Sequence, residues 1–316
     1  MITNSKIAHG DQLGAQLSTL ANLIYLSEIN NQKIVFYEEL INFRRGFQFL
    51  DVFKCEKIEV IKVHNFFSKF CLKRFRRIEY QDWKKNMKAA YFSKLKYYKD
   101  KLLYEIIKLL HNDFVYVKDL ENGIHCDKML MSLEDDKNYD IINGFGTYQD
   151  WKKCENRVKN EFTFKDEIVK KGDALFSSID FQGKNPVSVH FRLADYLVLS
   201  SLKLKPDYYK KALEQYDTDN TIFLIFSDEI EKVKKLDVFE NRNVIYMNEK
   251  NDAAIDMYLM TRCTGGNIIA NSSFSFWGAF LNSAPHKKVV CPHDFVNDTT
   301  VNYINGNYYP NEWVGL

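Results

Sequence analysis

Apolar and polar positions in the second half of the chain alternate between strand-like and helix-like periods. Short apolar runs have the length of buried strands, and the segments between them carry apolar residues at helical spacing. The predicted strands are Val187–Phe191, Thr221–Phe226, Asn243–Tyr246, Asn267–Ala270 and Lys288–Cys291. The predicted helices are Pro206–Tyr216, Glu229–Lys235, Asp252–Arg262 and Phe276–Asn282. This alternation predicts a parallel sheet with helices on both faces.

The first half begins with a similar unit. A strand within Ile2–Ala8 leads through a glycine-containing loop into a helix over Leu17–Tyr25, and Lys33–Phe36 is the next strand. Further along, Asp140–Asn143 reads as a strand and Arg157–Ser178 as a helix. At about 100–200 residues per domain, 316 residues indicate two α/β domains. We place them at 1–160 and 161–316.

Composition narrows the class of protein. The chain is 46% hydrophobic and 27% charged, as in ordinary globular proteins, and its net charge of +2 does not suggest a nucleic-acid partner. Six scattered cysteines, without zinc-site spacing, read as reduced thiols of a reducing compartment. The first ten residues lack a signal-peptide core, and no apolar run reaches the ~20 residues that cross a bilayer. We therefore expect a cytoplasmic protein.

The stretch Lys69–Lys101 departs from this balance, with 12 Lys or Arg against 3 acidic residues. Such a stretch is typical of a solvated helical face. One alternative is a surface that contacts anionic lipid headgroups, which would place the protein peripherally at the inner face of the membrane. RNA binding is a further alternative, although no RNA-binding motif accompanies the charge.

Polar residues follow three of the predicted strands, where ligands bind in open α/β sheets. These residues are His190, Arg192 and Asp195, then Ser227 and Asp228, then Asn271, Ser272 and Ser273. Arg192 can fork onto two phosphate oxygens and neutralise a leaving diphosphate; the alternative is a surface arginine in a salt bridge. The turn at Ser272 and Ser273 can bind an anion at a helix start, or simply cap the helix. The set suits a nucleotide diphosphate attached to a polar sugar.

One acidic motif is a candidate metal site. Asp217-Thr218-Asp219 looks like the D-x-D of metal-dependent glycosyltransferases, but it precedes the Thr221–Phe226 strand, at the amino side of the sheet. We therefore expect no metal ion, so that Arg192 and helix N-termini carry the charge of the leaving group.

Several blocks resemble the bacterial alpha-1,2-fucosyltransferases. The most specific are Asp256–Met260 and Ile268–Asn282, joined by Phe226-Ser227-Asp228 and Pro206–Tyr209. The resemblance covers about 140–316, is weak over 10–26 and is absent from the basic stretch. It implies GT-B architecture: two Rossmann-like domains with a cleft between them, the second holding GDP-fucose and the first the acceptor.

The resemblance also implies an activity and its residues. The expected activity is metal-independent, inverting transfer of fucose from GDP-fucose, without a cofactor, to a galactosyl-type hydroxyl of a glycan such as a lipid-linked surface polysaccharide. Arg192 and Asp195 are the expected catalytic residues. The expected donor-binding residues are Gly14, Gln16, His190, Arg192, Ser227, Asp228, Asp256, Asn271, Ser272, Ser273 and Phe274.

Two roles stay open within this set. Asp195 could take the acceptor proton or instead hold Arg192, and an acid of the first domain is an equal candidate for the base. Asp256 could accept from guanine N1–H and its 2-amino group, or could only stabilise the start of its helix.

Two positions depart from the family pattern. The phosphate motif H-x-R-R-x-D has Leu193 in place of its second arginine, and L-G-N-Q has Ala15 in place of Asn. These departures keep two alternatives open: a transferase that uses another GDP-sugar, and a catalytically weakened nucleotide- or glycan-binding homologue.

Overall fold

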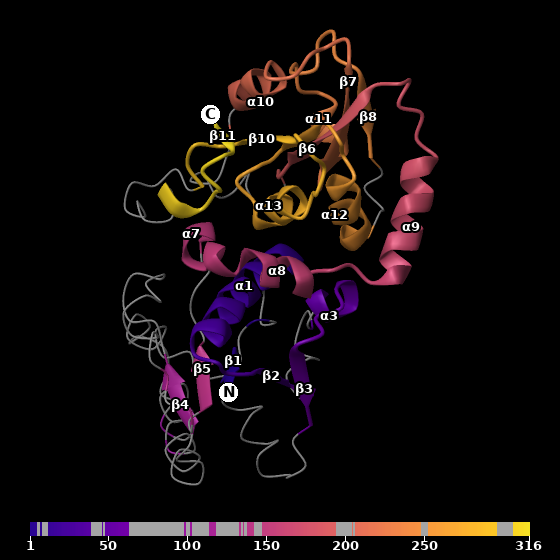
Figure 1. The fold of residues 1–316 in the computed structure, drawn as a ribbon. Coiled ribbons are helices and arrows are strands. Elements are labelled where there is room, and N and C mark those ends of the chain that lie inside the picture. Colours follow the sequence, from indigo (N-terminus) through magenta and orange to yellow (C-terminus); the bar gives the residue numbers. More distant parts are fainter. Residues whose placement is uncertain are drawn as a thin grey trace.

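The computed structural model describes residues 1–4, 7, 12–38, 46, 48–62, 98, 102, 114–117, 133, 135, 138–141, 147–193, 204, 206–247, 252–295 and 306–316. These residues form two parallel sheets with helices between them (Figure 1). The first sheet has the order β3-β2-β1-β5-β4. Its strands are β1 (Ile2–Thr3), β2 (Ile34–Tyr37), β3 (Ile58–Ile61), β4 (Phe114–Val117) and β5 (Asn138–Ile141).

The second sheet contains the strands predicted for the second half of the chain. The predicted strands are β6 (Asn185–Phe191), β7 (Thr221–Ser227), β8 (Val244–Tyr246), β9 (Gly266–Ile268) and β10 (Lys288–Cys291), and β11 (Val314–Gly315) is added at the edge. The order is β11-β10-β9-β6-β7-β8, with every pair parallel. The predicted α/β class with parallel sheets is therefore confirmed.

Helices connect and cover the sheets. They are α1 (Leu13–Ile29), α3 (Gln48–Val52), α7 (Tyr148–Trp151), the 3-10 turn η1 (Lys152–Cys154), α8 (Glu155–Glu161), α9 (Asp166–Ser177), α10 (Pro206–Leu213), α11 (Ile230–Val233), α12 (Ala253–Thr261) and α13 (Ser273–Phe280). The domain boundary predicted at 160/161 falls at the end of α8, and α9 beyond it packs on α12 (Figure 1). Gly172 makes this packing close, because a Cβ there would lie 2.2 Å from the Tyr258 ring.

A continuous hydrophobic core joins the two domains through α1 and α13. Trp277 of α13 is fully buried, stacks on Trp151 with ring centroids 5.4 Å apart, and donates from Nε1 to Ser18 Oγ of α1 at 3.1 Å. A second core packs β6 and β7 beneath α10 and α11. The side of β6 that faces α13 and the side that faces α10 are therefore both buried.

Several predicted helices had the wrong bounds, and two of these differences concern the domain boundary and the candidate site. The helix predicted over Arg157–Ser178 is two helices, because the residues between α8 and α9 are extended: Phe164 forms a bridge with Phe53, and the Lys165 N–H donates to the Val52 carbonyl. The helix predicted from Phe276 begins at Ser273, so the predicted serine turn is its first turn. Strands β3, β4 and β11 were not predicted.

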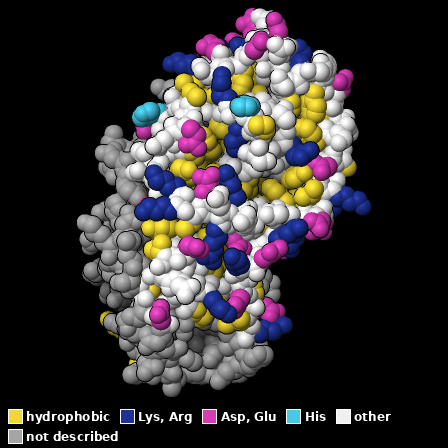
Figure 2. Space-filling view, viewed as in Figure 1, with side chains coloured by type: hydrophobic (Ala, Val, Ile, Leu, Met, Phe, Trp, Pro, Cys, Tyr) yellow, Lys and Arg dark blue, Asp and Glu magenta, His cyan; other side chains and the backbone are white. Residues whose placement is uncertain are grey.

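Charges of both signs are interspersed over the face in Figure 2. The basic stretch Lys69–Lys101 lies, except for Tyr98, outside the described residues. No helix in the described ranges is long and apolar enough to cross a membrane.

Candidate functional site

The order of the second sheet places a topological switch point between β6 and β9. The chain runs outward from β6 to β7 and β8, and then returns to the other side of β6 to form β9, β10 and β11. The connections therefore diverge at the carboxyl ends of β6 and β9, the position where open α/β sheets bind ligands. Arg192 follows β6, and the turn before α13 follows β9.

Arg192 and Asp228 meet at this edge of the sheet. The strand register pairs Phe191 with Ser227, so the residues that follow them are neighbours. Arg192 Nη1 lies 2.9 Å from Asp228 Oδ2, and each side chain is 21% exposed. Asp228 Oδ1 also accepts from the Leu193 N–H at 2.9 Å. One carboxylate thus holds both the guanidinium and the backbone that carries it.

His190 adds a neutral imidazole beside this pair. Its side chain is buried, and burial together with the Arg192 charge lowers the pKa of His190 to about 3. The imidazole ring centroid lies 5.6 Å from that of Phe274 in α13. Nδ1 makes no hydrogen bond to any described residue. A buried polar atom of this kind normally has a partner, which a ligand or water can supply.

The start of α13 completes one wall of the site. Its N-cap, Ser272, makes no side-chain capping bond, and the first amides of any helix lack intrahelical acceptors. Gly14, in the first turn of α1, lies directly against this end. A Cβ at Gly14 would lie 2.5 Å from the Phe274 backbone N. Two helix N-termini, one from each domain, therefore meet next to His190.

Three predicted donor-binding residues make framework contacts. Ser227 Oγ accepts from the Glu229 N–H at 3.0 Å, and Asn271 Nδ2 donates to the Phe295 carbonyl at 3.0 Å. Gln16 is fully buried, and its side chain donates from Nε2 to the Gly46 carbonyl at 3.0 Å. These contacts shape the turns around the switch point.

Asp256 lies in the first turn of α12 and is partly exposed. Asp195 lies outside the described residues. Leu193, the departure from the family motif, packs against the hydrophobic core of the α10 side.

The described part of the chain contains no cluster of three or more His, Cys, Asp or Glu that could hold a metal ion. The D-x-D motif lies before β7, as predicted, and forms a turn in which Asp217 accepts from the Asp219 N–H at 2.9 Å. Cys55, Cys154, Cys263 and Cys291 are buried free thiols, and burial raises the pKa of Cys291 to about 12.

Sequence reasoning missed the aromatic support of the site. The Tyr209 hydroxyl donates to the His190 carbonyl at 3.2 Å, and the Tyr209 ring stacks on Phe191 with centroids 3.8 Å apart. The Pro206–Tyr209 block is part of the family resemblance, but no feature of this block indicates which strand its tyrosines contact.

The family model described as Glycosyl transferase family 11 matches residues 127–316. The chain belongs to this family. The match includes all of the second sheet, both sides of the β6–β9 switch point and α13. It begins before β5 and leaves out α1, so Gly14 lies outside the matched part.

Curated relatives of this family 11 protein match over shorter segments. "O-antigen biosynthesis glycosyltransferase WbnK" of Escherichia coli is 32% identical over 128 residues, 37% of this chain and 41% of the relative. An "Alpha-1,2-colitosyltransferase" of Escherichia coli is 32% identical over 141 residues, 42% of this chain and 48% of the relative. The matched segments thus span less than half the length of either relative.

A solved structure matches nearly the whole chain. A mutant of Arabidopsis thaliana FUT1 in complex with GDP has a TM-score of 0.53 at 9% identity, covering 92% of this chain and 69% of that one. At this identity the likeness concerns the fold alone. It confirms the predicted GT-B architecture.

Proposed function

We propose that this family 11 protein is an inverting, metal-independent glycosyltransferase that moves fucose from GDP-fucose onto a galactosyl hydroxyl in alpha-1,2 linkage. The observation that carries the proposal is the Arg192–Asp228 pair beside His190 and the start of α13, at the β6–β9 switch point. This arrangement offers a fixed positive charge, a neutral imidazole and helix amides to one anion.

A nucleotide diphosphate fits these groups. Guanidinium groups stay charged and bind phosphate with two parallel hydrogen bonds, and helix N-termini bind anions through their amides and dipole. Asp228 would repel the same anion. We therefore assign it to positioning Arg192 rather than to contacting the donor. His190, neutral at pH 7, can donate a hydrogen bond to a phosphate oxygen without adding charge.

The transfer step needs few groups. The acceptor hydroxyl oxygen attacks the anomeric carbon of fucose from the face opposite GDP, and the bond between this carbon and the diphosphate oxygen breaks, so the configuration inverts. Arg192 and the α13 amides stabilise the charge that develops on the leaving GDP. A carboxylate accepts the hydroxyl proton, with Asp195 as one candidate. Asp256 is the candidate for reading guanine.

A second donor deserves a direct comparison, since one relative is named as a colitosyltransferase. Colitose is fucose without its 3-hydroxyl. A site that hydrogen-bonds this hydroxyl strongly rejects the sugar that lacks it, because buried polar groups would then lose their partner. Titration with GDP-fucose, GDP-colitose and GDP-mannose distinguishes the donors. Binding of GDP-mannose alone would refute the fucose assignment.

The test of the phosphate site is GDP binding and GDP release from the donor, measured for wild type, Arg192→Ala and Arg192→Lys. Losing a charge-assisted contact costs about 1.5–3 kcal/mol, so Arg192→Ala should weaken GDP binding about 10–150-fold. Arg192→Lys should recover only part of it, because an ammonium cannot fork onto two oxygens.

Arg262→Ala is the matched control. Arg262 also pairs with an aspartate, Asp173, at 3.3 Å, but at the far end of α12. Equal GDP affinity in wild type and Arg192→Ala would overturn the proposed site. Transfer that stops with EDTA and returns with Mg²⁺ would overturn metal independence.

Leu193→Arg tests the alternative of a weakened binding homologue. If wild type stays inert across glycan acceptors and the variant gains turnover, the binding-protein interpretation holds. The packing of Leu193 against the α10-side core favours the opposite result, in which the variant loses stability without gaining activity.

Peripheral membrane contact through Lys69–Lys101 remains part of the proposal for a lipid-linked acceptor. Sedimentation with anionic vesicles at low and high salt tests it. Absence of salt-sensitive binding would refute it.

A further inference from the structure

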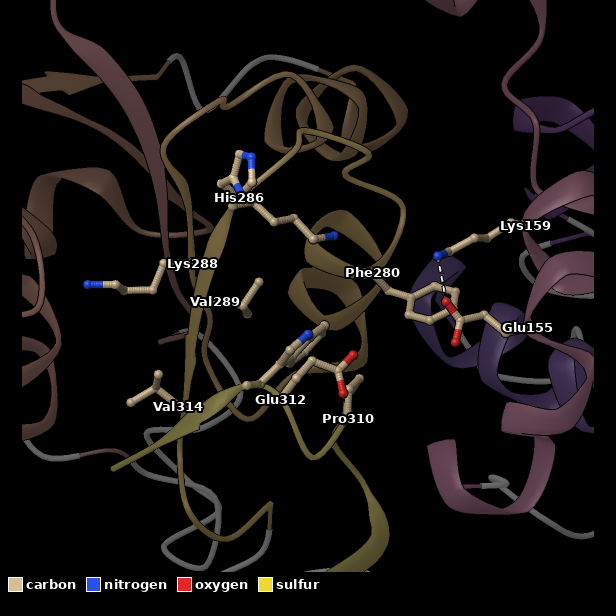
Figure 3. A pocket seen from close by; sticks show the side chains of 11 residues that line it. Glu155, Lys159, Phe280, His286, Lys288, Val289, Pro310, Glu312 and Val314 are labelled. Carbon is tan, nitrogen blue, oxygen red and sulfur yellow. Dashed lines mark hydrogen bonds and ion pairs between the residues drawn. The ribbon is translucent and has the colours of Figure 1, made fainter.

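A pocket lies at the opposite end of α13 from the proposed donor site. The eight residues of α13 span ~12 Å, so the two sites are separated by the length of this helix. The pocket has a volume of about 330 Å³, which is at the small end of the range for ligand sites. It opens between α8 on one side and β10 with the C-terminal segment on the other (Figure 3). Its lining comprises Glu155, Lys159, Phe280, His286, Lys287, Lys288, Val289, Pro310, Glu312, Trp313 and Val314.

The charged groups of the pocket are largely compensated within the protein. Lys159 Nζ pairs with Glu155 at 2.5 Å, and the Tyr148 hydroxyl donates to the other Glu155 oxygen at 2.8 Å. Lys287 Nζ donates to the carbonyls of Ala279 and Asn282 at the end of α13.

Lys287 lies in surroundings that disfavour its charged form. Burial and the nearby Lys159 lower the pKa of Lys287 to about 8, against the opposing effect of Glu155 and Glu312. Lys288 points away from the cavity (Figure 3) and donates to the Gln215 carbonyl at 2.6 Å. Apart from Lys288 and the His286 imidazole, the lining presents two carboxylates and two ammonium groups.

Trp313 supplies a rigid aromatic wall. Its ring packs on Phe276 and Tyr309, with centroids 5.3 and 6.1 Å away, while the side chain stays partly exposed. Phe280 also lines the pocket and is covered by Lys159, whose Nζ is 4.9 Å from the ring centroid. An aromatic wall beside mixed donors and acceptors is suited to a molecule with one apolar face and many hydroxyls.

We propose that this pocket binds a neutral saccharide of one or two pyranose units, independently of the proposed donor site. An anion would meet Glu155 and Glu312, and a cation would meet Lys159 and Lys287. Hydroxyl groups both donate and accept hydrogen bonds, so they can bond to the carboxylates and to the ammonium groups without bringing a further charge into the pocket. The C–H face of a pyranose would pack on Trp313. A bound saccharide would bridge α8 and the C-terminal segment.

The experiment is ligand-observed NMR followed by calorimetry, using galactose, lactose and N-acetylglucosamine as probes on the full chain saturated with GDP. We expect at least one of them to bind with a Kd of about 1–10 mM. Glu312→Ala, at an exposed position that should not disturb folding, should weaken this binding about 2–10-fold. Trp313→Phe should retain part of it and Trp313→Ala should abolish it.

Glu214→Ala is the matched control, since Glu214 is an exposed carboxylate just beyond α10 that does not line the pocket. It should leave the affinity unchanged. Three results would overturn the proposal: no binding of any probe to the folded chain, equal affinity in wild type and Glu312→Ala, or binding of phosphate or glycine in place of the sugars. Because GDP occupies the donor site throughout, failure here leaves the proposed function untouched, and failure of GDP binding would be seen separately.

Discussion

Replacing Gly14 with alanine tests the contact that joins the two domains at the proposed donor site. A Cβ at this position would lie 2.5 Å from Phe274 N, 2.7 Å from Phe274 Cα and 2.8 Å from the Ser273 carbonyl carbon. All three are backbone atoms, so no side-chain rotation relieves the overlap. The two helices must separate by roughly 1 Å to reach ordinary van der Waals distance.

The energetic cost follows from this overlap. Overpacking of a well-packed contact costs about 1–3 kcal/mol, and alanine recovers up to about 1 kcal/mol through its higher helix propensity. The net loss should be about 1–2 kcal/mol, or a few degrees in Tm for a chain of this size. Because the start of α13 forms part of the donor site, GDP affinity should fall as well.

The assay is thermal unfolding with and without GDP, together with GDP calorimetry. Gly306→Ala is the matched control, because a Cβ there would meet nothing within 4 Å. It should leave both Tm and GDP affinity unchanged. A Gly14→Ala protein with wild-type Tm and wild-type GDP affinity would show that α1 and α13 do not approach this closely.

Three further predictions concern the second domain. The pKa of His190, about 3 when folded against 6.5 as the ordinary value, means that only the unfolded chain takes up this proton as pH falls from 6.5 towards 3. The free energy of unfolding should therefore fall by up to about 1.4 kcal/mol for each pH unit below 6.5. Urea unfolding at pH 6.5 and 4.5 should show a smaller decrease for His190→Gln than for wild type. Equal decreases in the two proteins would refute this prediction. Asp228→Asn should lower turnover about 10–100-fold, because Arg192 loses the ion pair that positions it. GDP affinity should fall less than it does in Arg192→Ala. Unchanged turnover would contradict the positioning role of Asp228. Asn267→Ala should lower the free energy of unfolding by about 2–5 kcal/mol. The buried Asn267 amide donates to Ser188 Oγ at 2.7 Å and to the Met260 carbonyl at 2.9 Å, and the variant loses both hydrogen bonds. A loss under 1 kcal/mol in urea unfolding would contradict this network.

The bounds of the helices were harder to predict than the bounds of the predicted strands, and α8 and α9 show the reason. Their sequences are both helical, so the local pattern runs through the junction. The break arises because Phe164 and Lys165 pair with the backbone around Phe53, more than 100 residues earlier. A pairing over that distance leaves no periodicity in the local sequence.

The sequence alone determined the local features of this protein. Short apolar runs placed five of the strands of the second sheet, the residues at and beyond their carboxyl ends named His190, Arg192 and Asp228, and the Ile268–Asn282 block indicated the family. Each of these depends on residues close together in the chain, where period and spacing encode structure directly. The tertiary structure decided which groups meet: Asp228 with Arg192, Gly14 with Phe274, and Trp277 with Ser18, 259 residues away. Such contacts depend on sheet order and helix packing, which bring distant segments together, and so the pocket beyond α13 could not be predicted from any single stretch of sequence.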